Sequence, residues 1–163
     1  MIERTTLSLF LASALLVGAA PVLSDDAGHE SHDFELVTWM GRLQYHTHKL
    51  GLAIDAGNKA LAGYYIHEVE EAIEAIEKID EYDDVKIGAL VKEILVPTFE
   101  RLEDGFESGD QARLGTDYDA LLGACNQCHE KSNRFYLVVE RRHDNPYMQR
   151  FTPVKPSDGA DAR

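Results

Sequence analysis

Cys125-Asn126-Gln127-Cys128-His129 contains the only two cysteines of the chain. Two thiols separated by two residues and followed directly by a histidine are the pattern required for covalent haem c attachment, because each thiol can add to one vinyl group at the same porphyrin edge. The adjacent His129 can then serve as the proximal axial ligand of the iron. The stretch therefore predicts one covalent haem c, held by Cys125 and Cys128, with His129 on the iron.

Three other uses of the cysteine pair are alternatives to haem. A dithiol redox pair normally opens a helix after a strand, and no strand-helix-strand pattern precedes Cys125. A zinc site needs four ligands, and only His46, His48 or His67 could complete one. A disulfide between the two cysteines would close a very small loop and add little constraint to the unfolded chain. The histidine that follows Cys128 favours haem over all three.

The first 24 residues have the features of an export signal. Arg4 lies near the start, an apolar stretch follows from Leu7 to Val17, and small residues precede a plausible cleavage site after Ser24. The apolar stretch is too short to span a bilayer comfortably, so we expect cleavage, with an uncleaved tether as the alternative. Because haem c is assembled outside the cytoplasm, the two signals together predict a periplasmic protein that is soluble after cleavage.

The chain is strongly acidic, with 29 acidic residues, 16 basic residues and a formal net charge of −13. A negative charge of this size argues against nucleic acid or anionic lipid as a partner and attracts the protein to basic protein surfaces. The acidic composition would also be explained by solubility alone. The sequence therefore favours a redox partner protein with a basic surface. Apart from the export signal, no stretch is apolar and long enough to insert stably into a membrane.

Apolar residues recur at helical spacing in four stretches, 33–56, 58–79, 85–107 and 110–135. Gly57 and Gly109 mark ends of these stretches, Asp110 is expected to cap the fourth, and Pro97 is expected to kink the third. Four amphipathic helices with short connections predict an all-α fold, an antiparallel four-helix bundle whose fourth helix carries the CxxCH haem site.

The sequence predicts three different regions in the mature chain. Residues 25–32 are polar and are expected to form a flexible leader. Residues 33–152 are expected to form the bundle and an extended C-terminal tail, in which the apolar residues 135–151 pack near the haem. Residues 153–163 are rich in small and polar side chains and are expected to be disordered.

Several stretches resemble known cytochromes. A haem pentad in the last helix of an exported four-helix bundle is similar to the class II c-type cytochromes, the cytochrome c′ group, although 34 residues follow His129 here. The stretches 43–50 (LQYHTHKL), 58–71 (NKALAGYYIHEVEE), 124–130 (ACNQCHE) and 145–151 (NPYMQRF) look more closely like a set of bacterial cytochrome c-like proteins without an established activity. In the cytochrome c′ group the iron is five-coordinate or takes a methionine from the first helix, and Met40 lies on the first predicted helix.

Helix arithmetic ranks the candidates for the distal side of the iron. His48 lies nine residues before the turn at Gly57, which brings it close to the level of the pentad, and it borders the apolar stripe of its helix. Met40 lies eight residues farther from the turn, about 12 Å along the helix. We rank His48 first, Met40 second and His46 third, and we expect His67 at the surface. A solvated or hydrogen-bonded side chain remains the alternative for each, and an open iron site is also possible.

Three classes of function follow from a haem in a rigid bundle. Electron transfer is the leading prediction, because it needs no substrate pocket. Reversible binding or sensing of a small diatomic ligand is the alternative, and it requires an open or displaceable sixth position. An enzymatic, peroxidase-like activity ranks lowest, because it needs a distal acid-base pair and the first two predicted helices offer His48 with only Arg42 as a partner.

Overall fold

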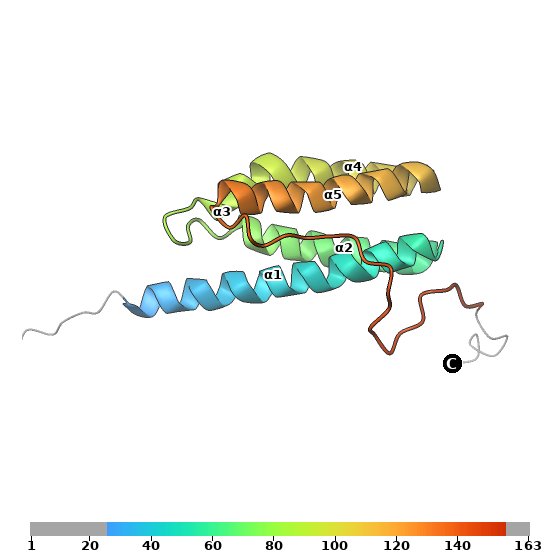
Figure 1. Ribbon diagram of the computed structural model, residues 1–163, viewed down its shortest axis with the longest axis horizontal. Coiled ribbons are helices and arrows are strands. Elements are labelled where there is room, and N and C mark those ends of the chain that lie inside the picture. The colour runs from blue at the N-terminus through green and yellow to red at the C-terminus, as the bar shows by residue number, and fades with distance from the viewer. Residues whose placement is uncertain (1–25, 156–163) are drawn as a thin grey trace, which may run out of the picture.

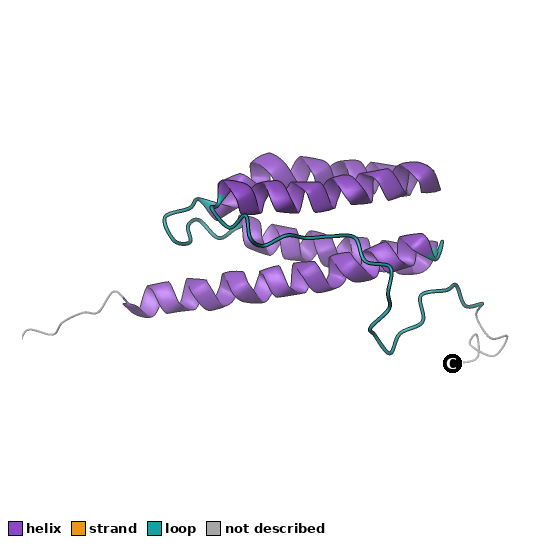
Figure 2. Ribbon diagram, in the orientation of Figure 1, coloured by secondary structure: helices purple, strands orange, loops and turns teal. Residues whose placement is uncertain are grey.

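The computed structural model describes residues 26–155, and side chains from residue 35 onward. Within these residues all regular structure is helical apart from one isolated bridge between Tyr82 and Val85 (Figure 2). The expected all-α fold class is therefore confirmed for this part of the chain. The expected export signal (residues 1–24) and most of the expected disordered end lie outside the described residues.

The first helix, α1, runs from Asp26 to Asp55 and begins earlier than the apolar pattern predicted. Residues 26–32, which we expected to form a flexible leader, are helical, so that expectation was wrong. The reason is that hydrophobic periodicity reports only the part of a helix that carries an apolar stripe. A polar extension continues the same backbone hydrogen bonding without leaving that signal.

The second helix, α2, runs from Lys59 to Glu77, close to its predicted limits. The Asn58 side chain caps it by accepting a hydrogen bond from the backbone N–H of Leu61 at 3.2 Å. Gly57, in the turn before it, has φ +64°, a left-handed conformation that glycine adopts without steric cost. The break predicted at this position is thus explained by the turn.

The third helical rod is built from α3 (Ile87–Leu90), the π-helix η1 (Val91–Leu95) and α4 (Val96–Ser108). Pro97 is the second residue of α4 and stands two residues after the end of the π-helical turn. Proline has no N–H and its ring collides with the carbonyl four residues earlier, so a wider turn before it relieves both problems. The kink predicted at Pro97 stays a prediction, and the feature that the structure has near this residue is a π-helical turn.

The last helix, α5, runs from Gln111 to Lys131 and carries the CxxCH pentad. As predicted, the Asp110 side chain caps it, accepting hydrogen bonds from the N–H groups of Ala112 and Arg113, both at 3.0 Å. Gly109 ends α4 with φ +72°. The helix stops at Lys131, a few residues before the predicted end at Phe135.

The helices lie side by side along the long axis, with α1 packed chiefly on α2 and α4 on α5 (Figure 1). The core between them is aliphatic and aromatic, with Leu50, Val69, Ile76, Leu102 and Leu121 almost completely buried. At one point α1 approaches α5 closely: a Cβ on Gly51 would lie 2.5 Å from the Tyr118 hydroxyl. Tyr118 donates a hydrogen bond to the Thr47 carbonyl at 3.0 Å there.

Residues 133–155, here the C-terminal segment, have no helix or strand. The segment turns back from the end of α5 and runs along the molecule between α5 and α1 (Figure 1). The expected packing holds for Val139, Tyr147 and Phe151, which contact or enter the core. It was wrong for residues 135–138, which are 46–71% exposed, because an extended segment contacts the body through only part of its surface.

A search of the described residues for a helix long and apolar enough to cross a membrane found none.

Candidate functional site

The three residues of the pentad that carry chemistry share one face of α5. Cys125, Cys128 and His129 occupy positions i, i+3 and i+4, which lie above one another on a helix. All three are half-buried, and both cysteines are free thiols. Burial raises the pKa of the Cys125 thiol to about 12 and that of Cys128 to about 11, so both are neutral at pH 7.

This face opens onto a cavity of about 880 Å³. The volume lies in the range of small-molecule and cofactor sites, roughly 300–1,000 Å³. α1, the rod from residue 87 to 95, α5 and the C-terminal segment all contribute to the lining. The lining is mainly apolar and includes both cysteines, His129, His48 and Met40, with Leu43, Leu90, Val91, Leu122, Leu137 and Val139 around them.

A backbone carbonyl orients the His129 ring. The Nδ1 atom of His129 lies 2.7 Å from the carbonyl oxygen of Leu137 in the C-terminal segment. A carbonyl can only accept, so Nδ1 must carry the proton and donate. The neutral imidazole therefore has its lone pair on Nε2, which is the form and the outer hydrogen bond that metal-ligating histidines use.

The His48 ring, on α1, also lines the cavity and is held from the C-terminal segment. Its Nδ1 atom lies 2.9 Å from the Tyr147 hydroxyl. Its Nε2 atom is buried and has no hydrogen-bond partner among the described residues. The hydroxyl of Thr47, the preceding residue and another lining residue, is likewise buried without a partner in that part of the chain. Such atoms are costly unless a ligand meets them.

The other distal candidates lie at different places. Met40 is half-buried and lines the cavity. His46 is not among the lining residues and lies 3.5 Å from the Glu68 carboxylate on α2, and its burial lowers its pKa. His67 is exposed, as expected, and lies 3.6 Å and 3.5 Å from the carboxylates of Glu70 and Glu71. His48 and Met40 therefore remain distal candidates because they line the cavity, whereas His46 and His67 do not line it.

Asn126, inside the pentad, ties α5 to the C-terminal segment. Its amide nitrogen donates to the Val139 carbonyl at 2.9 Å, and its amide oxygen accepts from the Val139 N–H at 2.7 Å. The side chain thus imitates a paired strand and holds the segment over the cavity. A variable position between two cysteines carries no sequence signal for this role.

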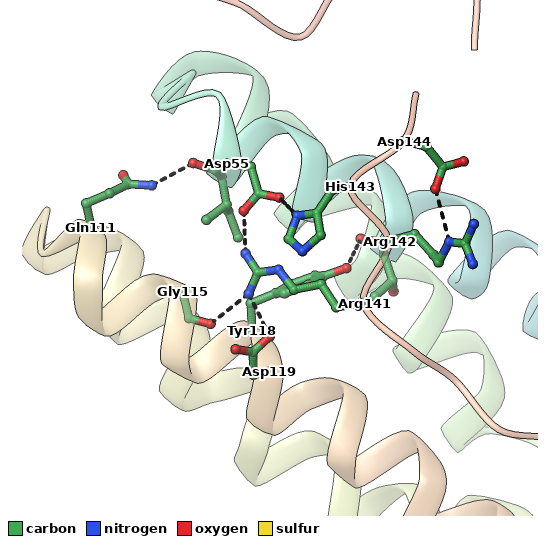
Figure 3. Close-up of polar contacts among 11 residues, drawn as sticks. Asp55, Gln111, Gly115, Tyr118, Asp119, Arg141, Arg142, His143 and Asp144 are labelled. Atoms are coloured by element: carbon green, nitrogen blue, oxygen red, sulfur yellow. Dashed lines mark hydrogen bonds and ion pairs between the residues drawn. The ribbon is translucent and has the colours of Figure 1, made fainter. Parts of the chain in front are cut away.

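Arg141 joins the same segment to two helices (Figure 3). Its guanidinium pairs with Asp55 at the end of α1 and with Asp119 on α5, the latter at 2.6 Å. It also lies over the Tyr118 ring, 4.9 Å from the ring centroid. His143 adds a second contact to Asp55, with its Nδ1 atom 2.7 Å from Oδ2.

Beyond Tyr147 the segment lies on an aromatic cluster around a buried lysine. Lys49 donates to the Gln149 side-chain oxygen at 2.9 Å, and its ammonium lies 4.3 Å and 4.7 Å from the ring centroids of Tyr45 and Tyr147. Tyr65 donates to the same Gln149 oxygen at 2.6 Å. The contacts with Tyr147 and Gln149 join residues far apart in the chain, so periodicity could not predict them.

The residues present could hold a haem c. The cavity brings together two thiols, a histidine with its Nε2 lone pair available and a second, partly unsatisfied histidine. Among the described residues no group of three or more His, Cys, Asp or Glu side chains could hold a metal ion by itself. Two thiols and two histidines at one cavity form a donor set that would suit porphyrin iron, which brings most of its own ligands. The chain matches no family model, no curated protein and no solved structure.

Proposed function

We propose that this chain is an exported c-type cytochrome, an antiparallel four-helix bundle similar to the class II group, that transfers electrons in the periplasm. One haem c is bound covalently through Cys125 and Cys128, with His129 as the proximal ligand. When bound, the haem supplies a one-electron redox centre. The export signal, the pentad and the cavity support this proposal, and the acidic net charge of −13 favours a basic redox partner.

The observation that carries the proposal is the Nδ1 hydrogen bond from His129 to the Leu137 carbonyl. It leaves Nε2 as a neutral donor on the same helix face as both thiols. A dithiol or disulfide pair does not require a histidine in this tautomer.

Acid-acetone extraction of the purified full chain tests the covalent attachment. Haem that stays with the polypeptide is the expected result, and haem that moves into the acetone would overturn the proposal. His129→Ala should disturb the absorption spectrum far more than His67→Ala, because His67 is exposed and does not line the cavity.

The role of His48 distinguishes electron transfer from ligand binding. We propose that His48 acts on the distal side, because its Nε2 atom is buried and unpartnered among the described residues. The same atom supports the alternative function, in which it hydrogen-bonds a diatomic ligand. As a ligand, His48 gives a low-spin ferrous protein that takes up carbon monoxide slowly, whereas as a hydrogen-bond partner it leaves a high-spin iron with an open position.

Substitution of the two cavity residues distinguishes these cases. If His48 ligates the iron, His48→Leu should convert the protein from low spin to high spin. If His48 only hydrogen-bonds a bound diatomic ligand, the iron is already high-spin and His48→Leu should change the affinity for that ligand. Met40→Leu is the comparison, since Met40 lines the same cavity and is the second distal candidate. It should leave spin state and ligand affinity unchanged if His48 is the distal residue. A His48→Leu protein with unchanged spectrum, potential and ligand affinity would exclude both distal roles for His48.

A further inference from the structure

The C-terminal segment contacts both candidate axial histidines through their Nδ1 atoms. Leu137 offers a carbonyl to His129 at 2.7 Å, and Tyr147 offers a hydroxyl to His48 at 2.9 Å. The two residues lie ten positions apart in one irregular segment, whereas the histidines lie on α5 and α1. A single segment therefore holds the outer nitrogen of each ring and leaves Nε2 as the remaining nitrogen of both.

The two hydrogen bonds differ in what they determine. The Leu137 carbonyl can only accept, which decides the His129 tautomer. The Tyr147 hydroxyl can donate or accept, so His48 could carry its proton on either nitrogen. The surroundings of Nε2 distinguish these states. A proton there would be a buried donor with no acceptor among the described residues, whereas a lone pair there can bind the iron.

Tyr147 is well placed to accept. Its ring is held by contacts with Tyr45 and Phe151, at centroid distances of 5.3 Å and 6.3 Å, and by the Lys49 ammonium. The side chain is half-buried, and a hydroxyl oxygen that accepts from His48 keeps its own proton for a second hydrogen bond. Packing thus fixes the hydroxyl beside Nδ1 independently of the hydrogen bond itself.

We propose that Tyr147 is a positioning residue that accepts the Nδ1 proton of His48 and so presents Nε2 as a lone pair toward the haem iron. This inference rests on the proposed function and deepens it, because an acceptor on Nδ1 increases the basicity of the ligating nitrogen. It makes His48 the sixth ligand rather than a donor to a bound gas. It also makes the C-terminal segment responsible for the orientation of both axial rings.

Tyr147→Phe in the full-length holoprotein tests the proposal, because phenylalanine keeps the ring contacts and loses only the hydroxyl. Carbon monoxide has to displace His48, so its affinity for the ferrous protein should rise roughly tenfold, and the reduction potential should move upward. Tyr64→Phe is the matched control, since Tyr64 is exposed, contacts Tyr65 at the edge of the same aromatic cluster and does not line the cavity. It should leave both quantities unchanged.

A lower carbon monoxide affinity in Tyr147→Phe would mean that His48 donates from Nε2, and unchanged affinity would mean that the hydroxyl has no influence. Either result overturns the proposal. Nitrogen-15 NMR of the full chain gives an independent readout: wild type should show a protonated Nδ1 and an unprotonated Nε2 at His48, and Tyr147→Phe should lose this preference. If the purified chain carries no haem, the proposed function fails, while the His48 tautomer in that same chain still decides the role of Tyr147.

Discussion

Single side chains carry much of the organisation around the cavity. Asn126 forms two hydrogen bonds with the Val139 backbone, and Tyr147 and Leu137 each hold one histidine ring. In every case a group on the irregular segment meets a group on a helix. The positions of the histidine rings therefore depend on contacts that are individually small, about 0.5–1.5 kcal/mol each.

Asn126→Ala should release the segment near Val139 without breaking α5. Loss of two hydrogen bonds predicts a fall of about 1–2 kcal/mol in the free energy of unfolding, measured in urea. Hydrogen exchange at the Val139 amide should also become faster. Gln127→Ala is the control, because Gln127 is exposed and neighbours Asn126 in the pentad. Equal effects of the two substitutions would contradict the proposed anchor.

At the level of elements, the contact between α1 and α5 depends on a glycine. Gly51 lets the Tyr118 ring lie against the α1 backbone, where its hydroxyl reaches the Thr47 carbonyl. Both Thr47 and Tyr118 line the cavity, so this approach sets the spacing of two of its walls.

Gly51→Ala should destabilise the protein by about 1–3 kcal/mol, because the added methyl group would overlap the Tyr118 ring. Thermal unfolding monitored by circular dichroism measures the change. Gly123→Ala, at an exposed position of α5 with open space around it, should instead stabilise by about 0.5–1 kcal/mol. A neutral Gly51→Ala would show that Tyr118 can move away without cost.

Glu103 on α4 should make stability depend on pH. Burial, followed by the charges of Glu70 and Glu107, raises the pKa of Glu103 above its ordinary value of 4.5. The folded chain then binds this proton more readily than the unfolded chain, so the native state gains stability as pH falls through the folded pKa toward 4.5.

Glu103→Gln removes the penalty of the buried charge. We expect it to raise the free energy of unfolding at pH 7 by about 0.5 kcal/mol, the size of unfavourable like-charge pairs on a helix. The gain should disappear near pH 4, where the native glutamate is protonated. Urea unfolding at both pH values measures it, with exposed Glu140→Gln as the control. Lower stability of the Glu103→Gln protein at pH 7 would contradict the prediction.

On the scale of the whole molecule, a basic segment lies on an acidic body. Residues 133–155 contain five basic and two acidic residues, although the chain as a whole carries a net charge of −13. Arg141 pairs with α1 and α5 at once, and Arg134 pairs with Asp83 at 2.6 Å. The segment thus closes the cavity through ion pairs at separate points along its length, in addition to packing by Phe151.

Arg141→Met should loosen this closure, because it leaves Asp55 and Asp119 without their shared partner. We expect a loss of about 1.5–3 kcal/mol, typical of hydrogen bonds to charged groups, and faster chymotrypsin cleavage after Tyr147. The exposed Arg150→Met, on the same segment, should change stability by less than about 0.5 kcal/mol. Cleavage at the wild-type rate in Arg141→Met would argue that Arg141 does not hold the segment.

Patterns within one or two helical turns predicted the local features of this protein. The helical periodicity and the cap at Asp110 both follow from residues close together in the chain. These predictions were confirmed because hydrogen bonding and side-chain direction in a helix are set by neighbours three and four residues away. Bound haem stays a prediction from the pentad.

The groups that meet across the cavity could be identified only from the folded chain. Tyr147 reaches His48 over 99 positions of sequence, and His143 reaches Asp55 over 88. The path of an irregular segment has no period, so no pattern predicts where its hydroxyls and carbonyls will lie. The exposure of residues 135–138 has the same cause, since their apolar character is visible in the sequence and the side of the chain that faces the helices is not.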